Sequence, residues 1–163
     1  MKGQTISSFM KIVNLEKGHT AAAAEFIQKA VGGELFEIET VKTYKEDHME
    51  MIKEAKEELA NGTRVELKGY LEDFDKYDIL FIGFPNWWNA LPMPVVTFLE
   101  HYDWFGKKVI PFCTSQGSGF GNMLEQVKKI CAGAEFGKEL ALRGSKTEKS
   151  EKKVADWARQ NIV

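Results

Sequence analysis

Short apolar runs alternate with longer amphipathic segments along the chain. Residues 79–82 are the clearest run, because they contain only isoleucine, leucine and phenylalanine. A continuous apolar run of this length is typical of a strand buried on both faces, as in a parallel sheet covered by helices. Four similar runs predict further strands, the last of which contains Gly137. The predicted strands cover residues 9–13, 35–38, 77–83, 107–113 and 135–142.

The segments between these strands repeat with the period of an α-helix. Between Ala23 and Val31, for example, apolar residues recur three and four positions apart, which places them on one helical face. Gly32 and Gly33 then predict the end of this helix in left-handed backbone. Alternating strands and helices with right-handed crossovers predict a single α/β domain, a three-layer α/β/α sandwich over residues 1–163. The predicted helices cover residues 21–31, 47–60, 93–101, 120–132 and 145–162.

Three loops follow the carboxyl ends of the first, third and fourth predicted strands. In a doubly wound sheet with the strand order 2-1-3-4-5 these strands are neighbours, so the three loops meet at one crevice. The first loop brings a glycine and a threonine to the start of a helix, the second carries aromatic residues, and the third carries small polar residues. The loops cover residues 14–20, 85–94 and 114–119.

Two adjacent tryptophans, Trp87 and Trp88, dominate the second loop. Pro85 stops the preceding strand and Pro92 delays the next helix, so both indoles are expected at the rim of the sheet. Large rigid aromatic rings at the carboxyl edge of a parallel sheet form a platform for a flat ligand. The alternative is that both rings fill the top of the core, because tryptophan is usually buried.

Composition narrows the class of protein without identifying a function. The 163 residues suit one domain with a sizeable core, and 44% hydrophobic and 28% charged residues are typical of a globular protein. A formal charge of −2 gives no electrostatic reason to expect a nucleic acid or a membrane as partner. No apolar run approaches the ~20 residues that span a bilayer, and the N-terminus lacks the apolar core of a signal peptide. The expected location is therefore the cytoplasm.

Other reactive residues do not form recognisable sites. His19, His48 and His101 lack the spacing of metal ligands, and only His19 is near the predicted crevice. Cys113 and Cys131 form no CxxC pair, and a cysteine at a strand end is more often a small buried residue than a nucleophile. We expect neither a metal site nor a hydrolytic triad.

The longest recognisable motifs surround the second and third loops. They are Tyr-Asp-Ile-Leu-Phe-Ile-Gly-Phe-Pro at residues 77–85, the tryptophan pair with Pro92, Thr-Phe-Leu-Glu at residues 97–100, and the segment 106–115. In these motifs the chain resembles the flavodoxin-like FMN-binding flavoproteins, close to the short bacterial flavodoxins and flavin-dependent reductases. The resemblance covers most of the chain. It implies a flavodoxin-like fold with a five-stranded parallel sheet of order 2-1-3-4-5, and FMN as the cofactor.

The resemblance also implies how FMN is held. The first loop binds the phosphate through hydroxyls and the N–H groups of a helix start. The second loop contacts the isoalloxazine ring through a tryptophan, and the third offers N–H and hydroxyl groups to the pyrimidine end. The chemistry takes place on FMN, so no catalytic residue is assigned. The expected cofactor-binding residues are Lys17, Gly18, His19, Thr20, Pro85, Asn86, Trp87, Trp88, Asn89, Thr114, Ser115, Gln116, Gly117 and Gly119.

Three residues depart from the family's pattern. Leu15 stands where a hydroxyl is expected, Glu16 adds a negative charge, and Asn89 replaces a common glycine. A carboxylate ~6 Å from a phosphate costs roughly 3 kcal/mol at an effective dielectric constant of ~20, whereas a helix N-terminus returns only ~0.3–2 kcal/mol. Binding therefore requires Glu16 to point outward, and Lys17 or Thr20 to replace part of the missing hydroxyl. Asparagine tolerates positive φ better than most residues, so a redox-linked peptide flip stays compatible with Asn89.

These features favour a redox flavoprotein. Within that class we expect an FMN-dependent oxidoreductase that reduces quinone-like or other small acceptors, with NAD(P)H as a compatible donor. One alternative is a one-electron carrier flavodoxin, although a charge of −2 provides little of the acidic face on which carrier docking commonly relies. The other is a flavodoxin-like domain that has lost FMN and acts as an interaction or regulatory module, which Leu15 and Glu16 favour. The expected partner is a small molecule or a redox protein, and a homodimer is compatible with the sequence.

Overall fold

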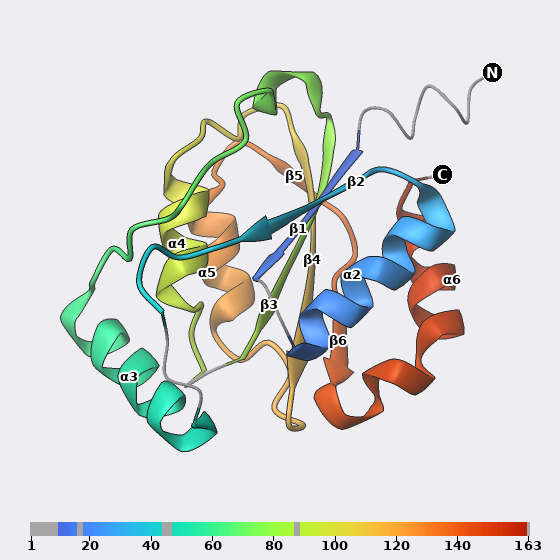
Figure 1. Cartoon of the computed structure of the whole chain (residues 1–163). Helices are drawn as coiled ribbons and strands as arrows, with labels where there is room; N and C mark the ends of the chain where they lie inside the picture. Colours follow the sequence, from blue (N-terminus) through green and yellow to red (C-terminus); the bar gives the residue numbers. More distant parts are fainter. Residues whose placement is uncertain (1–9, 16–17, 44–46, 87–88, 163) are drawn as a thin grey trace.

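A computed structural model of the chain describes residues 10–15, 18–43, 47–86 and 89–162. Its middle layer is a parallel sheet in the order β2-β1-β3-β4-β5, with β6 also paired to β4 (Figure 1). The parallel direction and the strand order that the sequence predicts are therefore confirmed. The strands are β1 (Met10–Leu15), β2 (Glu34–Ile38), β3 (Ile79–Pro85), β4 (Lys108–Ser115), β5 (Glu135–Phe136) and β6 (Leu140–Arg143).

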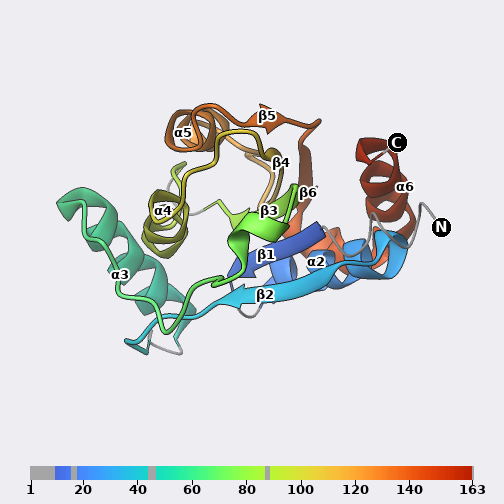
Figure 2. The ribbon, with the colours of Figure 1, turned by 90° about the horizontal axis from the view of Figure 1, so that it is seen from above.

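Helices cover both faces of the sheet, as Figure 2 shows from above. Helices α2 and α6 pack together on one face, α4 and α5 lie on the other, and α3 lies beside α4 at the periphery. The helices are α2 (Gly18–Val31), α3 (His48–Asn61), α4 (Met93–Glu100), α5 (Met123–Ile130) and α6 (Glu151–Asn161), and the 3₁₀ turns are η1 (Phe74–Lys76) and η2 (Gly144–Lys149).

The fifth position of the sheet differs from the prediction of one continuous strand. In the described part of the chain the sheet has six strands, because β5 pairs with the start of β4 and β6 pairs with its end. Asn161 of α6 lies at the break, where its Oδ1 accepts from Lys138 N at 2.9 Å and its Nδ2 donates to Lys138 O at 3.2 Å. Trp157 Nε1 also donates to Lys138 O, at 2.7 Å. Side chains of α6 thus replace the ladder hydrogen bonds that an unbroken strand would make.

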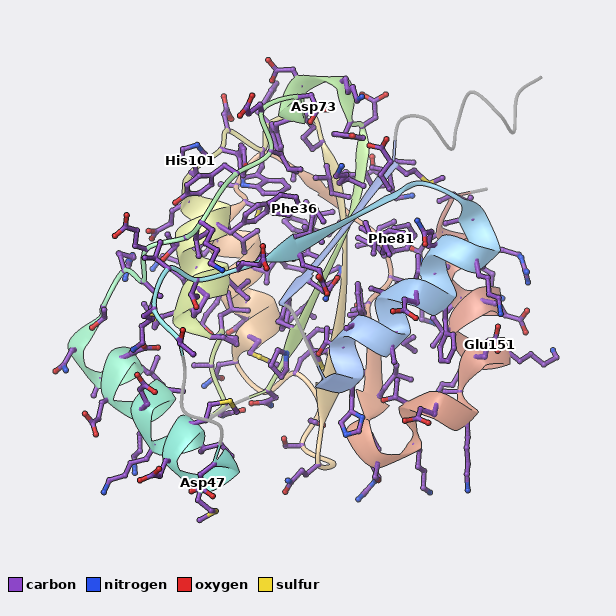
Figure 3. All side chains as sticks on the ribbon, in the orientation of Figure 1. Phe36, Asp47, Asp73, Phe81, His101 and Glu151 are labelled. Carbon is purple, nitrogen blue, oxygen red and sulfur yellow. The ribbon has the colours of Figure 1, made fainter. Side chains whose placement is uncertain are left out.

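Strand β3 illustrates how the sequence builds two cores. Leu80, Ile82 and Phe84 belong to the core under α4 and α5, whereas Phe81 belongs to the core under α2 and α6. Figure 3 accordingly shows Phe81 on the side of α2. Because both faces are covered, the strand reads as a continuous apolar run rather than an alternating one. Gly83 is needed here, since a Cβ at this position would collide with the ring of Phe112.

Element boundaries follow local signals with some shifts. Helix α3 begins after Asp47, whose side chain accepts from Glu50 N at 3.1 Å, and it ends at Gly62 with φ of 61°. The predicted final helix over residues 145–162 instead starts as the 3₁₀ turn η2, and α6 begins only at Glu151. Strand β4 is longer than predicted and includes Thr114 and Ser115.

Candidate functional site

A cleft of about 770 Å³ lies at the carboxyl edge of the sheet. The start of α2 and the segments after β3 and β4 border it, so the structure brings together the three loops that the sequence predicts to converge. Helix α3 and the segment after β6 complete the lining. The described lining residues are His19, Ile52, Pro85, Asn86, Asn89, Thr114, Ser115, Gln116, Ser118, Arg143, Gly144 and Ser145.

The first loop contributes the start of α2. Helix α2 already begins at Gly18, which places His19 in its first turn, and the exposed imidazole of His19 lines the cleft. Thr20 is 3% exposed, and its Oγ1 lies 2.9 Å from Thr114 Oγ1. This hydroxyl pair joins α2 to the end of β4 beneath the cleft, so Thr20 does not line it. Glu16, Lys17 and the side chain of Leu15 lie outside the described part of the chain.

The second loop is held to the third by Asn86. Its backbone N–H donates to Thr114 O at 2.8 Å, and its Nδ2 donates to Gly119 O at 2.7 Å and to Ser118 Oγ at 3.2 Å. Its Oδ1 accepts from Asn89 N at 2.9 Å. The Asn86 side chain therefore fixes the spacing of two loops, while Pro85 and Asn86 both line the cleft. Trp87 and Trp88 lie outside the described residues.

Asn89 adopts a positive φ, the conformation that asparagine tolerates in place of the family's common glycine. Its φ is 61°, and among the described residues it alone combines positive φ with a side chain. The side chain of Asn89 lies against Gly121, where a Cβ would collide with its amide. Gly121 has φ of 54°. Close packing between the β3 and β4 segments thus depends on a glycine that sequence reasoning did not single out.

The third loop is partly a continuation of the strand. Thr114 and Ser115 are the last residues of β4 and are buried, and Ser115 Oγ accepts from Gly117 N at 3.1 Å and from Gly119 N at 3.0 Å. These two N–H groups therefore shape the loop in this structure, and neither glycine lines the cleft. Gln116 and Ser118 are exposed and line it. Cofactor binding by the loop stays a prediction.

Sequence reasoning missed one part of the cleft lining, the end of β6 and the segment that follows it. Arg143 pairs in register with Ser115, and Gly144 and Ser145 follow it along the wall. The carboxyl-edge argument applies to the last strand as well, so the triplet Arg-Gly-Ser could have been found by extending it. Ile52 could not, because the position of α3 against the cleft depends on tertiary packing.

The lining has an uneven distribution of charge. Arg143 is a permanent cation and His19 an imidazole, whereas the described lining residues include no carboxylate. No hydrogen bond or ion pair joins the side chain of Arg143 to any described residue, so its guanidinium is available to a ligand or to solvent. With hydroxyl and amide groups beside it, the cleft suits an anionic ligand that accepts several hydrogen bonds.

The two cysteine thiols are buried and inert. Burial raises the pKa of the Cys113 thiol to about 12, and it does the same for Cys131. Neither thiol is a nucleophile at neutral pH. The described residues contain no cluster of three histidine, cysteine or carboxylate side chains that could bind a metal ion. Among the same residues, every helix is too short or too polar to pass through a bilayer.

The comparison with known proteins agrees with the observed fold. The family model described as flavodoxin matches residues 13–161. The chain belongs to the flavodoxin family. The resemblance inferred from the sequence motifs is therefore confirmed, and with it the flavodoxin-like fold.

The solved structures similar to this flavodoxin-family chain include proteins described as flavoproteins. A protein of Bacteroides uniformis assigned as a flavoprotein is 31% identical with a TM-score of 0.81, over 94% of this chain and 99% of its own. One of Bacteroides eggerthii is 30% identical with a TM-score of 0.80, over 96% and 99%. A flavoprotein of Lactobacillus acidophilus, solved in complex with FMN, is 21% identical with a TM-score of 0.69, over 88% and 97%. No curated protein matches the chain.

Proposed function

We propose that the protein binds FMN in the cleft at the carboxyl edge and acts as an oxidoreductase on quinone-like or other small acceptors. The observation that carries the proposal is the lining of the cleft, in which a cation, hydroxyls and amides gather without a described carboxylate. FMN complexation of the Lactobacillus acidophilus protein supports the choice of ligand through the shared fold. The cleft volume of about 770 Å³ falls within the range of small-molecule sites.

The described residues fit the polar parts of FMN. The start of α2 with Gly18 and His19 would hold the phosphate, because the first N–H groups of a helix lack internal acceptors. Gln116 and Ser118 of the third loop would hydrogen-bond the pyrimidine end, and Asn89 would present backbone beside the ring. Trp87 and Trp88 are the sequence-predicted partners of the ring face. When bound, FMN supplies the transfer of one or two electrons.

Two of the predicted cofactor-binding residues are already hydrogen-bonded within the protein, which gives them a different role from the one that the sequence suggested. Asn86 and Thr20 make hydrogen bonds between segments, so they would position the loops around the ligand rather than donate to it directly. A preorganised site of this kind binds more tightly, because less loop entropy is lost on binding.

A carrier flavodoxin is the second candidate, and the net charge is the observation that bears on it. A formal charge of −2 offers a weak acidic face for docking to a protein partner, which favours the enzyme. The two candidates separate by turnover. An FMN-loaded enzyme consumes NADH or NADPH in the presence of a benzoquinone, whereas a carrier passes electrons only when a separate reductase is added.

Titration with FMN, followed by quenching of flavin fluorescence, tests the cofactor. Wild-type protein is expected to quench FMN and to absorb near ~450 nm once loaded. Gln116→Glu places a carboxylate in the cleft wall with little change of shape, and it should weaken FMN binding by roughly tenfold through repulsion. Gln160→Glu adds the same charge on the exposed surface of α6 and should leave the affinity unchanged. A colourless protein that does not quench FMN would favour the interaction module instead.

A further inference from the structure

We infer that Arg143 makes the cleft select a phosphorylated flavin over riboflavin, as the cation that pairs with the phosphate. The inference rests on the proposed function and adds a residue from the last strand to the phosphate end of the site. It starts from the position of Arg143 at the end of β6, where the chain turns into η2.

The turn after β6 packs against the start of α2. A Cβ on Gly144 would lie 2.7 Å from Cδ2 of His19, so the backbone next to Arg143 touches the first turn of that helix. The described first turn of α2 contains no acidic residue. Gly144, the residue after Arg143, therefore lies beside the helix end at which the phosphate is expected.

The guanidinium of Arg143 lies against the loop that follows β4. A Cβ on Gly117 would lie 2.9 Å from Nη2 of Arg143, so the side chain extends from β6 across the β4 loop along the cleft wall. No described residue hydrogen-bonds or pairs with it. Arginine presents several N–H donors in a planar fork, which matches two oxygens of a phosphate better than a lysine ammonium does.

The sequence of the first loop gives a phosphate site a reason to use such a cation. The first loop has leucine at position 15 and glutamate at position 16, where a phosphate site gains nothing from either residue. The Thr20 hydroxyl, one candidate for the missing donor, lies within hydrogen-bonding distance of Thr114. A cation from another strand would restore the charge balance of the site, because two opposite charges in direct contact attract each other more strongly than a helix end alone attracts an anion.

Flavin selectivity is the readout that isolates this role. FMN and riboflavin share the ring, so the ratio of their dissociation constants reports on the phosphate alone. Arg143→Gln is expected to weaken FMN binding by roughly ten- to a hundredfold and riboflavin binding by less than about threefold. The FMN affinity of Arg143→Lys should fall between those of the wild type and Arg143→Gln, since lysine keeps the charge and loses the planar fork of donors. Arg159→Gln on α6, which removes an exposed arginine away from the cleft, should change neither affinity.

Salt and inorganic phosphate provide a second readout. FMN affinity should decline more steeply with ionic strength in the wild type than in Arg143→Gln. Inorganic phosphate should weaken FMN binding to the wild type more than riboflavin binding, because it competes for the same cation. Equal weakening of both flavins by phosphate would count against the assignment.

The failures are distinguishable. If wild-type protein binds FMN but Arg143→Gln keeps the wild-type ratio of FMN to riboflavin affinity, the role of Arg143 is wrong and the proposed function stands. If Arg143→Gln weakens both flavins equally, Arg143 acts on the ring or on the fold, and the inference is again overturned. If wild-type protein binds neither flavin, both the proposed function and the inference fail.

Discussion

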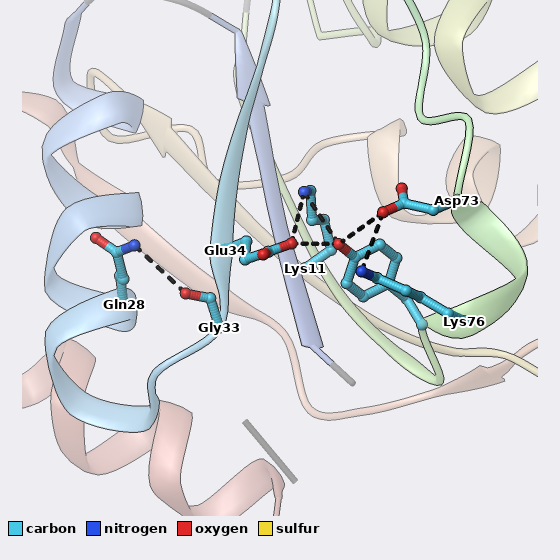
Figure 4. Close-up of polar contacts among 7 residues, drawn as sticks. Lys11, Gln28, Gly33, Glu34, Asp73 and Lys76 are labelled. Atoms are coloured by element: carbon cyan, nitrogen blue, oxygen red, sulfur yellow. Dashed lines mark hydrogen bonds and ion pairs between the residues drawn. The ribbon is translucent and has the colours of Figure 1, made fainter. Parts of the chain in front are cut away.

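The two edges of the sheet treat their polar residues in opposite ways. At the amino edge, Figure 4 shows a network in which the polar groups bind one another. Lys11 Nζ lies 3.1 Å from Glu34 Oε1 and 3.2 Å from Tyr77 Oη, and the Tyr77 hydroxyl also hydrogen-bonds the Glu34 carboxylate. Asp73 Oδ2 lies 3.4 Å from the Tyr77 hydroxyl and pairs with Lys76 at 3.2 Å. Lys11 is 8% exposed, and this network is what allows a lysine to be buried there.

At the carboxyl edge the polar groups fall into two sets. Thr20, Thr114 and Asn86 hold the segments together, whereas Arg143 and Gln116 face the cleft without a described partner. A closed network contributes to stability, because its donors and acceptors satisfy each other. Unpaired cations and amides at an open cleft contribute nothing comparable, but they are available to a ligand. The comparison therefore separates an edge that stabilises the fold from an edge whose polar groups are available to a ligand.

The largest expected effect tests whether stability and binding can be separated at all. Trp157 is 7% exposed, with its ring 5.6 Å from that of Phe81, so Trp157→Ala should lower the free energy of unfolding by about 3–5 kcal/mol. Folded Trp157→Ala protein should keep its FMN affinity within about threefold, whereas Trp88→Ala should weaken FMN binding by at least about tenfold. Urea unfolding and FMN titration measure the two effects. Equal losses of FMN affinity in both variants would contradict the assignment of the second loop.

An intermediate effect is expected at the amino edge. Tyr77→Phe removes the hydroxyl that links Lys11, Glu34 and Asp73, and it should lower the free energy of unfolding by about 1–2 kcal/mol while FMN affinity stays unchanged. Tyr70→Phe is the matched control, because the Tyr70 ring stacks on His101 at 3.8 Å and its hydroxyl has no described partner. A loss of FMN affinity in Tyr77→Phe would show that the two edges are coupled.

The smallest effect is a pH dependence. The hydrogen bond from Tyr77, with the hydrogen bond and charge of Lys11, lowers the pKa of Glu34 below its usual 4.5. A lowered folded-state pKa stabilises the fold above pH 4.5, and this contribution is lost as the pH falls further. Because the Glu34 side chain is 61% exposed, solvent screening limits it to about 0.2–1 kcal/mol. Glu34→Gln should be less stable than wild type at pH 7 by this amount, and the difference should vanish in acid.

Glu139→Gln provides the reference for the pH series. Glu139 is exposed between β5 and β6 and makes no described ion pair, so its replacement should leave the pH profile of unfolding unchanged. A wild-type profile that matches that of Glu34→Gln throughout would mean that the network at the amino edge does not form in solution.

Local sequence was sufficient for most of the secondary structure. The apolar run of β3, the Asp47 cap and the Gly62 end of α3 are local signals, because a strand's burial and a helix's end groups depend on neighbouring residues. The alternation of such elements also predicted the parallel sheet and the edge at which its loops meet. The family's motifs then predicted FMN as the ligand.

Tertiary structure alone decided which polar groups hydrogen-bond within the protein and which are available to a ligand. Thr20 and Thr114 are 94 residues apart, so no local pattern could predict their contact. The break at Lys138 likewise depends on Asn161, which comes from the last helix. The same long-range packing made Asn86 a link between loops and left Arg143 in the cleft wall without a partner among the described residues. Sequence determines the elements because their periodicity is local, whereas a site is a set of distances between elements, and only the packed chain sets those.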